Sequence, residues 1–160
     1  MVSFGVTRRT LRLRLPWSNG VTARVSGTGH GDGYINSTGG IALDIALPAG
    51  TPVLAPANVT VTRSCLASGT QSHRAIQLRD SVGRIYSLIH VSAPSAAVAV
   101  GKTYLQGEQI GVVASDLPKD SNCAVSYGVH LHMGLPSNPF SIGGYNLGSS
   151  TPLNTQLTAR

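Results

Sequence analysis

The chain is poor in charged side chains, in aromatic rings and in long apolar stretches. Charged residues make up only 11% of its 160 residues, which is well below the usual share and argues against a mainly helical protein. No apolar run approaches the roughly 20 residues of a transmembrane helix, so we expect no membrane span. One tryptophan (Trp17) and two phenylalanines (Phe4, Phe140) offer few surfaces on which bases could stack. We therefore expect no nucleic-acid partner, and a basic nucleic-acid-binding β-barrel is disfavoured.

Cysteine is equally scarce. Cys65 and Cys123 are the only two, and neither lies in a Cys-x-x-Cys unit, which argues against a redox motif or a zinc finger. They could form one disulfide, or remain two buried thiols in a cytosolic protein. The low charge and the many Ser, Thr and Gly residues favour the disulfide and a secreted, extracellular protein. Met1–Arg14 holds four arginines and no apolar core, so no signal peptide is visible and the secreted form would be mature or trimmed.

Glycine and proline, by contrast, are plentiful, with 19 and 9 residues, and they divide the chain into short apolar runs. Such spacing is typical of antiparallel sheets. None of the longer stretches has apolar residues that recur at the period of a helix. We therefore predict an all-β fold, with residues 1–160 forming a single compact domain of mainly antiparallel sheets and long loops. The predicted strands are Val21–Val25, Ala42–Ala46, Pro52–Ala55, Val59–Ser64, Ala75–Arg79, Ile85–His90, Ile110–Ala114 and Val129–Leu135.

The segments between these runs are also informative. Asp80–Gly83 suits a turn, so the strands on either side of it should form a hairpin. Ser92–Val100 is the nearest approach to a helix, but it is short and contains a proline. Gly27–Gly40 and Ser115–Gly128 are polar, irregular segments that we expect to be long loops of the kind that often carry function.

The net charge of +6 at neutral pH is compatible with several roles. It favours polyanionic partners, such as nucleic acid or the anionic polymers of a cell wall. A need for solubility alone would also explain this charge, so the net charge does not distinguish between possible functions.

The sharpest local feature is His130-Leu131-His132 within a strand-like run. Because side chains alternate along a strand, both imidazoles would project from one face, about 6.5–7 Å apart. That separation suits two zinc ligands after side-chain rotation, or one ligand and one neighbour of the metal. The same spacing also occurs by chance on exposed strands, so the motif alone is unspecific.

Four other residues have side chains that could contribute to a site. Asp44 interrupts the apolar run Ile41–Leu47, where a carboxylate is costly unless it is paired, hydrogen-bonded or bound to metal; alternation also allows it to face solvent. His30 lies in the glycine-rich segment and His90 ends a predicted strand, and either could simply be solvated. His73 falls in a predicted turn, and we expect it to be a solvated residue.

Six segments occur in a characteristic order over roughly residues 13–147. They are Gly29-His30, Leu43-Asp44-Ile45, Gly50-Thr51-Pro52-Val53-x-Ala55, Ile89-His90, Gly107-Glu108-Gln109-Ile110-Gly111 and Gly128-Val129-His130-Leu131-His132-Met133. In this order they resemble the lysostaphin-type zinc metallopeptidases, most closely the staphylolysin (LasA-like) and beta-lytic branch. Cys65 and Cys123 also look like the disulfide pair of that branch.

The resemblance implies a zinc site and a reaction. His30, Asp44 and His132 would bind one Zn²⁺, and two imidazoles with one carboxylate leave a fourth position for water. His90 and His130 would be the catalytic histidines, one taking the water's proton and the other stabilising the oxyanion. The implied protein is a secreted endopeptidase that cuts peptide bonds of bacterial peptidoglycan. Its implied fold is a compact β-domain, the duplicated hybrid motif, with loops around a groove.

Departures from the family pattern bear on these expectations. Many relatives place the first histidine four residues before the aspartate, where this chain has Gly40, so zinc binding depends on His30. Ser126–Val129 stands where relatives usually have Ser-Thr-Gly-Pro, which affects substrate contacts more than metal binding. Tyr34 and Tyr127 are candidates for contacting substrate, although both could simply pack the loops.

A second interpretation stays open beside the peptidase. A degenerate member of the same fold would bind the cell wall or a partner protein without catalysis. Five chemically suitable residues at matching positions argue against it. The partners expected for the peptidase are the cross-link or stem peptides of peptidoglycan, together with anionic wall polymers.

Overall fold

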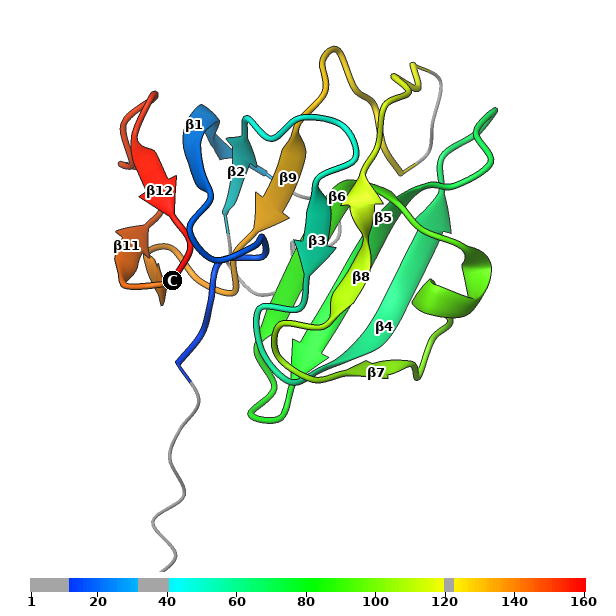
Figure 1. The fold of residues 1–160 in the computed structure, drawn as a ribbon, viewed down its shortest axis with the longest axis horizontal. Coiled ribbons are helices and arrows are strands. Elements are labelled where there is room, and N and C mark those ends of the chain that lie inside the picture. The colour runs from blue at the N-terminus through cyan, green and yellow to red at the C-terminus, as the bar shows by residue number, and fades with distance from the viewer. Residues whose placement is uncertain (1–11, 32–40, 120–122) are drawn as a thin grey trace, which may run out of the picture.

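Antiparallel strands account for nearly all the regular structure of the computed structural model, which describes residues 12–31, 41–119 and 123–160 (Figure 1). Within these residues there is no α-helix, and the only helical element is the 3₁₀ turn η2 (Ser95–Val98). The all-β prediction is therefore confirmed. The strands are β1 (Thr22–His30), β2 (Ala42–Ile45), β3 (Pro52–Leu54), β4 (Val59–Leu66), β5 (His73–Asp80), β6 (Ile85–Ser92), β7 (Thr103–Tyr104), β8 (Gln109–Val113), β9 (Leu131–Gly134), β10 (Phe140–Ile142), β11 (Tyr145–Leu147) and β12 (Gln156–Thr158).

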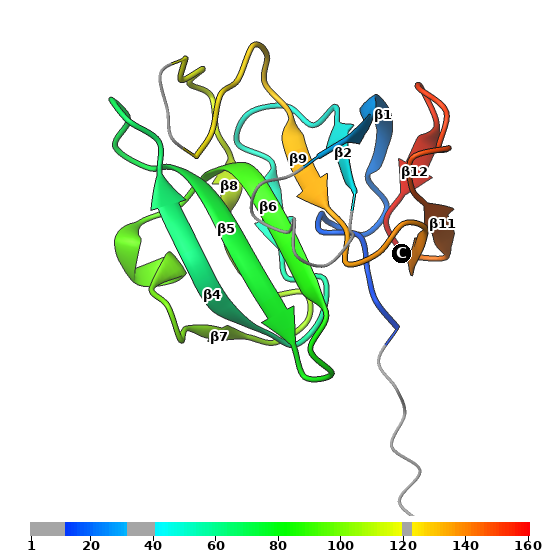
Figure 2. The same cartoon turned by 180° about the vertical axis from the view of Figure 1, so that it is seen from behind.

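The main sheet runs in the order β12-β1-β2-β9-β6-β5-β4-β7, and β8 joins it by pairing with both β3 and β6. Strands β10 and β11 form a separate two-stranded ribbon. Figures 1 and 2 show β3 and β8 covering one face of the sheet made by β4, β5 and β6. Strands β2, β9 and β6, which come from distant parts of the sequence, therefore lie side by side in the middle of the sheet.

A single large cluster of buried apolar side chains fills the space between these layers. Alternation places Ala23 and Val25 of β1 in it, while Arg24 between them faces solvent. Trp17 is fully buried, and its indole nitrogen donates a hydrogen bond to the carbonyl of Val21 at 3.0 Å. The core thus fixes the central strands, which carry the site described below.

Several strand boundaries differ from those predicted. Residues 27–30, expected in a loop, continue β1 to His30, because two register shifts against β2 let the pairing resume after irregular positions. The predicted strand Ile85–His90 extends as β6 to Ser92, and the predicted strand Val129–Leu135 shortens to β9, which begins after His130. The short strands β7, β10, β11 and β12 were not predicted, because two or three residues carry too little pattern to reveal a strand.

Cys65 on β4 and Cys123 form a disulfide. Beside it lies a small apolar cluster of Ala67, Ala75, Ile89 and Ala124. The bridge therefore ties the loop that leads into β9 to the end of β4. In the part of the chain that the structure describes, no helix has the length and apolar character that crossing a membrane requires.

The predicted hairpin at Asp80–Gly83 joins β5 to β6, and the buried carboxylate of Asp80 organises it. Asp80 accepts hydrogen bonds from the backbone N–H groups of Val82 and Arg84, from the Arg84 guanidinium and from the Tyr86 hydroxyl. Burial alone would raise the pKa of Asp80, but these contacts with Arg84 and Tyr86 outweigh it and lower the pKa below its ordinary value.

Replacing Asp80 by asparagine is expected to destabilise the fold by about 2 kcal/mol at pH 7. Because the folded-state pKa lies below the unfolded value of about 3.9, ionised Asp80 contributes stability above about pH 4. That contribution is lost as the pH falls through the folded-state pKa. Urea unfolding of wild type and Asp80→Asn at pH 7 and pH 3 measures both effects. Ser81→Ala, at the exposed tip of the same turn, is the control; equal losses at the two pH values would contradict the prediction.

Candidate metal centre

The three residues expected to bind metal lie on neighbouring strands. Asp44 of β2 and His132 of β9 are directly opposite each other in the antiparallel pairing. His30 is the last residue of β1 and pairs with Ala42 of β2. Because opposed side chains on one sheet face lie about 5 Å apart, strand pairing brings together residues that are up to 102 positions apart in the sequence.

The donor atoms of these residues converge closely. The Nε2 atom of His30 lies 3.2 Å from Oδ1 of Asp44 and 3.2 Å from Nδ1 of His132. Nδ1 of His132 lies 3.5 Å from Oδ1 of Asp44. Ligand atoms of a tetrahedral zinc ion, each about 2.0–2.1 Å from the metal, are separated by about 3.3 Å. The residues present therefore fit a zinc site, with one carboxylate oxygen and two imidazole nitrogens as donors.

Oδ1 of Asp44 gives independent support for this fit. It is buried and accepts no hydrogen bond, although Nε2 of His130 also lies 3.3 Å away. Burial would raise the pKa of Asp44, but the imidazoles of His130, His132 and His30 outweigh it and hold that pKa well below its ordinary value. A buried, ionised carboxylate oxygen without a hydrogen bond is costly, and a bound cation would satisfy it.

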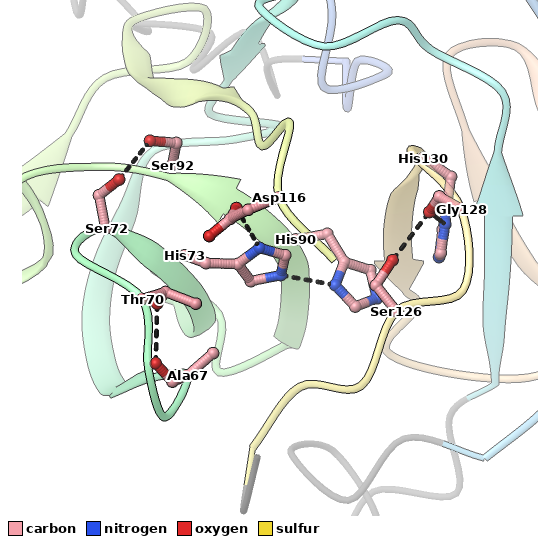
Figure 3. Close-up of polar contacts among 10 residues, drawn as sticks. All are labelled: Ala67, Thr70, Ser72, His73, His90, Ser92, Asp116, Ser126, Gly128 and His130. Atoms are coloured by element: carbon pink, nitrogen blue, oxygen red, sulfur yellow. Dashed lines mark hydrogen bonds and ion pairs between the residues drawn. The ribbon is translucent and has the colours of Figure 1, made fainter. Parts of the chain in front are cut away.

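His130 lies just before β9, and its ring is held from the side remote from Asp44. Nδ1 of His130 donates to the carbonyl oxygen of Gly128 at 2.7 Å, and the Ser126 hydroxyl donates to the same oxygen at 2.8 Å (Figure 3). Burial would lower the pKa of His130, but the contact with Asp44 prevails and raises it. With Nδ1 engaged, Nε2 is the nitrogen that faces the metal site.

His90 occupies an unusual backbone position in β6. The register shift between β5 and β6 pairs Arg74 with Val91 and Ala75 with Ile89, which leaves His90 as the extra residue of a bulge. Its φ of 66° lies in the left-handed region, which non-glycine residues seldom adopt and which often marks a functional site. Burial, followed by the nearby His130 and His73, lowers the pKa of His90 to about 3, so its ring is neutral at pH 7.

His73 contradicts the expectation of a solvated turn residue. It begins β5, its side chain is only 1% exposed, and it makes hydrogen bonds to His90 and Asp116. The turn before it is shorter than expected, so His73 pairs with Ser92 of β6 and enters the interior. The residues around His73 in the sequence do not predict its burial, because its partner Asp116 lies 43 residues away.

Of the two tyrosines expected to contact substrate, the structure describes only Tyr127. Tyr127 is 84% exposed, and the Lys119 ammonium lies 4.2 Å from the centre of its ring. Lys119 also donates to the carbonyl of Ser126 at 2.8 Å, which anchors this loop beside His130. Tyr34 lies outside the described residues. A role for either tyrosine in substrate binding stays a prediction.

Gly27 positions the carboxylate of Asp44, with which it pairs across β1 and β2. A Cβ atom at Gly27 would lie 2.5 Å from Oδ2 of Asp44, so a larger residue must displace the carboxylate. Gly27→Ala is expected to weaken zinc binding by about 10- to 100-fold, the range typical when support for a ligand is lost. Zinc titration measures this. Gly31→Ala is the control, because a Cβ there meets nothing within 4 Å; equal affinities of the two variants would contradict the prediction.

Comparison with known proteins gives three findings. Peptidase family M23 is the family whose model matches the chain, over residues 38–141. An uncharacterized metalloprotease of Haemophilus influenzae is 32% identical over 90 residues, which represent 56% of this chain and only 17% of that protein. The solved structure of pseudoalterin, described as a novel M23 metalloprotease from the deep sea, is 22% identical with a TM-score of 0.61. That match covers 86% of this chain and 82% of pseudoalterin, and it shows a shared fold.

Proposed function

Because the chain belongs to peptidase family M23, we propose that it is a zinc-dependent endopeptidase that hydrolyses peptide bonds in bacterial peptidoglycan. The observation that carries the proposal is the convergence of His30, Asp44 and His132, whose donor atoms lie 3.2–3.5 Å apart. That spacing, with the orphaned Oδ1 of Asp44, suits a zinc ion held by three protein ligands. Three ligands are typical of catalytic rather than structural zinc sites.

In the proposed reaction, zinc held by these three residues supplies Lewis acidity and a water of lowered pKa. The remaining tasks fall to the chain's own groups. His90 and His130 lie with ring centres 4.5 Å apart beside the metal ligands, within reach of the same reacting atoms. One accepts the proton of the attacking water as general base. The other stabilises the oxyanion that forms on the scissile carbonyl.

The finer assignments are also proposals. Placement in the staphylolysin and beta-lytic branch is supported by the distant first histidine, His30, and by the Cys65–Cys123 disulfide. The disulfide further supports secretion, because such bridges persist outside the cytosol. Tyr34 and Tyr127 are proposed to contact the peptide substrate. Anionic wall polymers are proposed as partners on the basis of the net charge of +6.

Zinc quantitation coupled to a cleavage assay tests the proposed function. The purified chain is expected to hold about one zinc ion, to lose activity with a chelator and to regain it when zinc is restored. Purified peptidoglycan, a glycyl peptide and a D-alanyl peptide serve as alternative substrates. An empty site with retained wall binding would instead support a non-catalytic member of the fold. Zinc binding with cleavage of none of the three substrates would overturn the choice of peptidoglycan.

A further inference from the structure

A chain of hydrogen bonds reaches His90 from the side opposite the metal site. Oδ1 of Asp116 lies 2.9 Å from Nδ1 of His73, and Nε2 of His73 lies 2.8 Å from Nδ1 of His90. The ring centres of His73 and His90 are 5.0 Å apart, and those of His90 and His130 are 4.5 Å apart. Figure 3 shows His90 between His73 and His130, with the Asp116 carboxylate at the far end of the chain.

The chemistry of these groups favours one arrangement of their protons. An ionised carboxylate can only accept hydrogen bonds, so Nδ1 of His73 carries the proton that Asp116 accepts. With His73 neutral, as burial of a ring only 1% exposed favours, its Nε2 is an acceptor and Nδ1 of His90 donates to it. A neutral His90 has one N–H group, so its Nε2 is left with a free lone pair.

We infer, on the premise of the proposed peptidase function, that Asp116 and His73 are positioning residues that hold His90 with its proton on Nδ1 and so make Nε2 the proton acceptor of the reaction. His90 then takes the role of general base, which neither the sequence nor the family resemblance assigned. His130 is left to stabilise the oxyanion.

The hydrogen bonds that run from Asp116 through His73 to His90 form a relay. This relay contributes most to the reaction when His90 becomes charged. As water attacks the scissile carbonyl, one O–H bond of the water breaks and its proton forms an N–H bond with Nε2 of His90. The oxygen's electron pair forms the new bond to the carbonyl carbon. His90 is then an imidazolium, and its hydrogen bond to His73 becomes charge-assisted and stronger. The carboxylate of Asp116, which is 50% exposed and lies 2.9 Å from Nδ1 of His73, offsets part of the buried charge through His73.

The fold holds this relay in place at both ends. The backbone N–H of Ala114, two residues before Asp116, donates to the carbonyl of His90 at 2.9 Å. The hydroxyl of Ser72, which precedes His73, lies 2.7 Å from that of Ser92, two residues after His90 (Figure 3). The bulge at His90 places its side chain within reach of His73 across the β5–β6 pairing. Such support for the orientation of a catalytic ring is what positioning residues provide.

The first test reads the tautomer directly, without relying on activity. Long-range ¹H–¹⁵N spectra of zinc-loaded wild type labelled with ¹⁵N-histidine distinguish a protonated from an unprotonated ring nitrogen. The His90 signals are assigned by their loss in His90→Asn. We expect His90 to be protonated on Nδ1 and unprotonated on Nε2. The opposite tautomer, with the proton on Nε2, would overturn the inference.

The second test compares two substitutions of His73 that differ in reach. In His73→Gln, the longer side chain can place its amide oxygen near the position of Nε2 and still accept from His90. In His73→Asn, the shorter amide can reach Asp116 but not His90. We expect kcat of His73→Asn to fall by about 10- to 100-fold, with KM and zinc content unchanged. His73→Gln should retain kcat within a few-fold, and Asp116→Asn should lie between the two.

A double-mutant comparison separates positioning from a general effect on the fold. If His73 acts only through His90, then His73→Asn costs no further activity in a His90→Asn background. Additive losses, or equal kcat values for the two His73 variants, would overturn the inference. Wild type that holds zinc but cleaves no peptide would overturn the proposed function instead. The tautomer spectrum would still report in that case whether the relay orients His90.

Discussion

Replacing Asp44 by asparagine is expected to abolish zinc binding and peptide cleavage together. The amide keeps the shape of the carboxylate but not its charge, and Oδ1 of Asp44 lies at the centre of the site, 3.2–3.5 Å from three imidazole nitrogens. Two neutral ligands would remain, one fewer than catalytic zinc sites use. We expect zinc affinity to fall by more than about 100-fold, beyond the effect of losing a supporting residue. His132→Ala, which removes a nitrogen donor, should do the same.

Metal analysis after dialysis against dilute zinc, alongside a cleavage assay on the same sample, measures both effects. Glu108→Gln is a suitable control, because Glu108 is an exposed carboxylate in the turn between β7 and β8 and its loss should change neither quantity. An Asp44→Asn protein that still holds one zinc ion per chain would exclude Asp44 as a ligand. Loss of activity with zinc retained would place Asp44 among the catalytic groups instead.

Replacing His90 or His130 by asparagine should reduce kcat by about 10²- to 10⁴-fold while zinc stays bound. In each case the shorter amide can still occupy the position of Nδ1, which contacts Gly128 in one residue and His73 in the other. The substitution removes Nε2, which in His130 lies 3.3 Å from Oδ1 of Asp44 and in His90 is the inferred proton acceptor. Steady-state kinetics and zinc content, measured for both variants, test this expectation.

The two histidines should differ in one respect that activity alone does not show. His130 lies 3.3 Å from Oδ1 of Asp44, so its loss should alter zinc affinity slightly, whereas loss of His90 should not. If either asparagine variant fails to retain zinc, that histidine is a ligand rather than a catalytic group. Unchanged kcat in both variants would require another source for the base and for the oxyanion contact.

The candidate site was predictable from the sequence to the extent that its chemistry leaves a local mark. Asp44 stands out because a carboxylate in an apolar run needs a partner. His130 and His132 stand out through their spacing, and the order of the motifs supplied His30 and His90. The structure brings the three candidate ligands together, yet it places His30 at the end of a strand rather than in a loop. The register shifts that permit this depend on contacts with β2, and such contacts cannot be inferred from the local sequence pattern.

The class of fold and the kind of chemistry could be inferred from local sequence patterns and motif order. Short apolar runs divided by glycine and proline specify antiparallel strands, because turns and alternation act over only a few residues. The arrangement of the outer histidines, by contrast, depends on long-range strand pairing. His73 becomes a neighbour of His90 through pairing of β5 with β6, and Asp116 reaches His73 because β8, which precedes it, pairs with β6. Burial and hydrogen-bond geometry then favour one arrangement of the protons, and both are properties of residues brought together from distant positions in the chain.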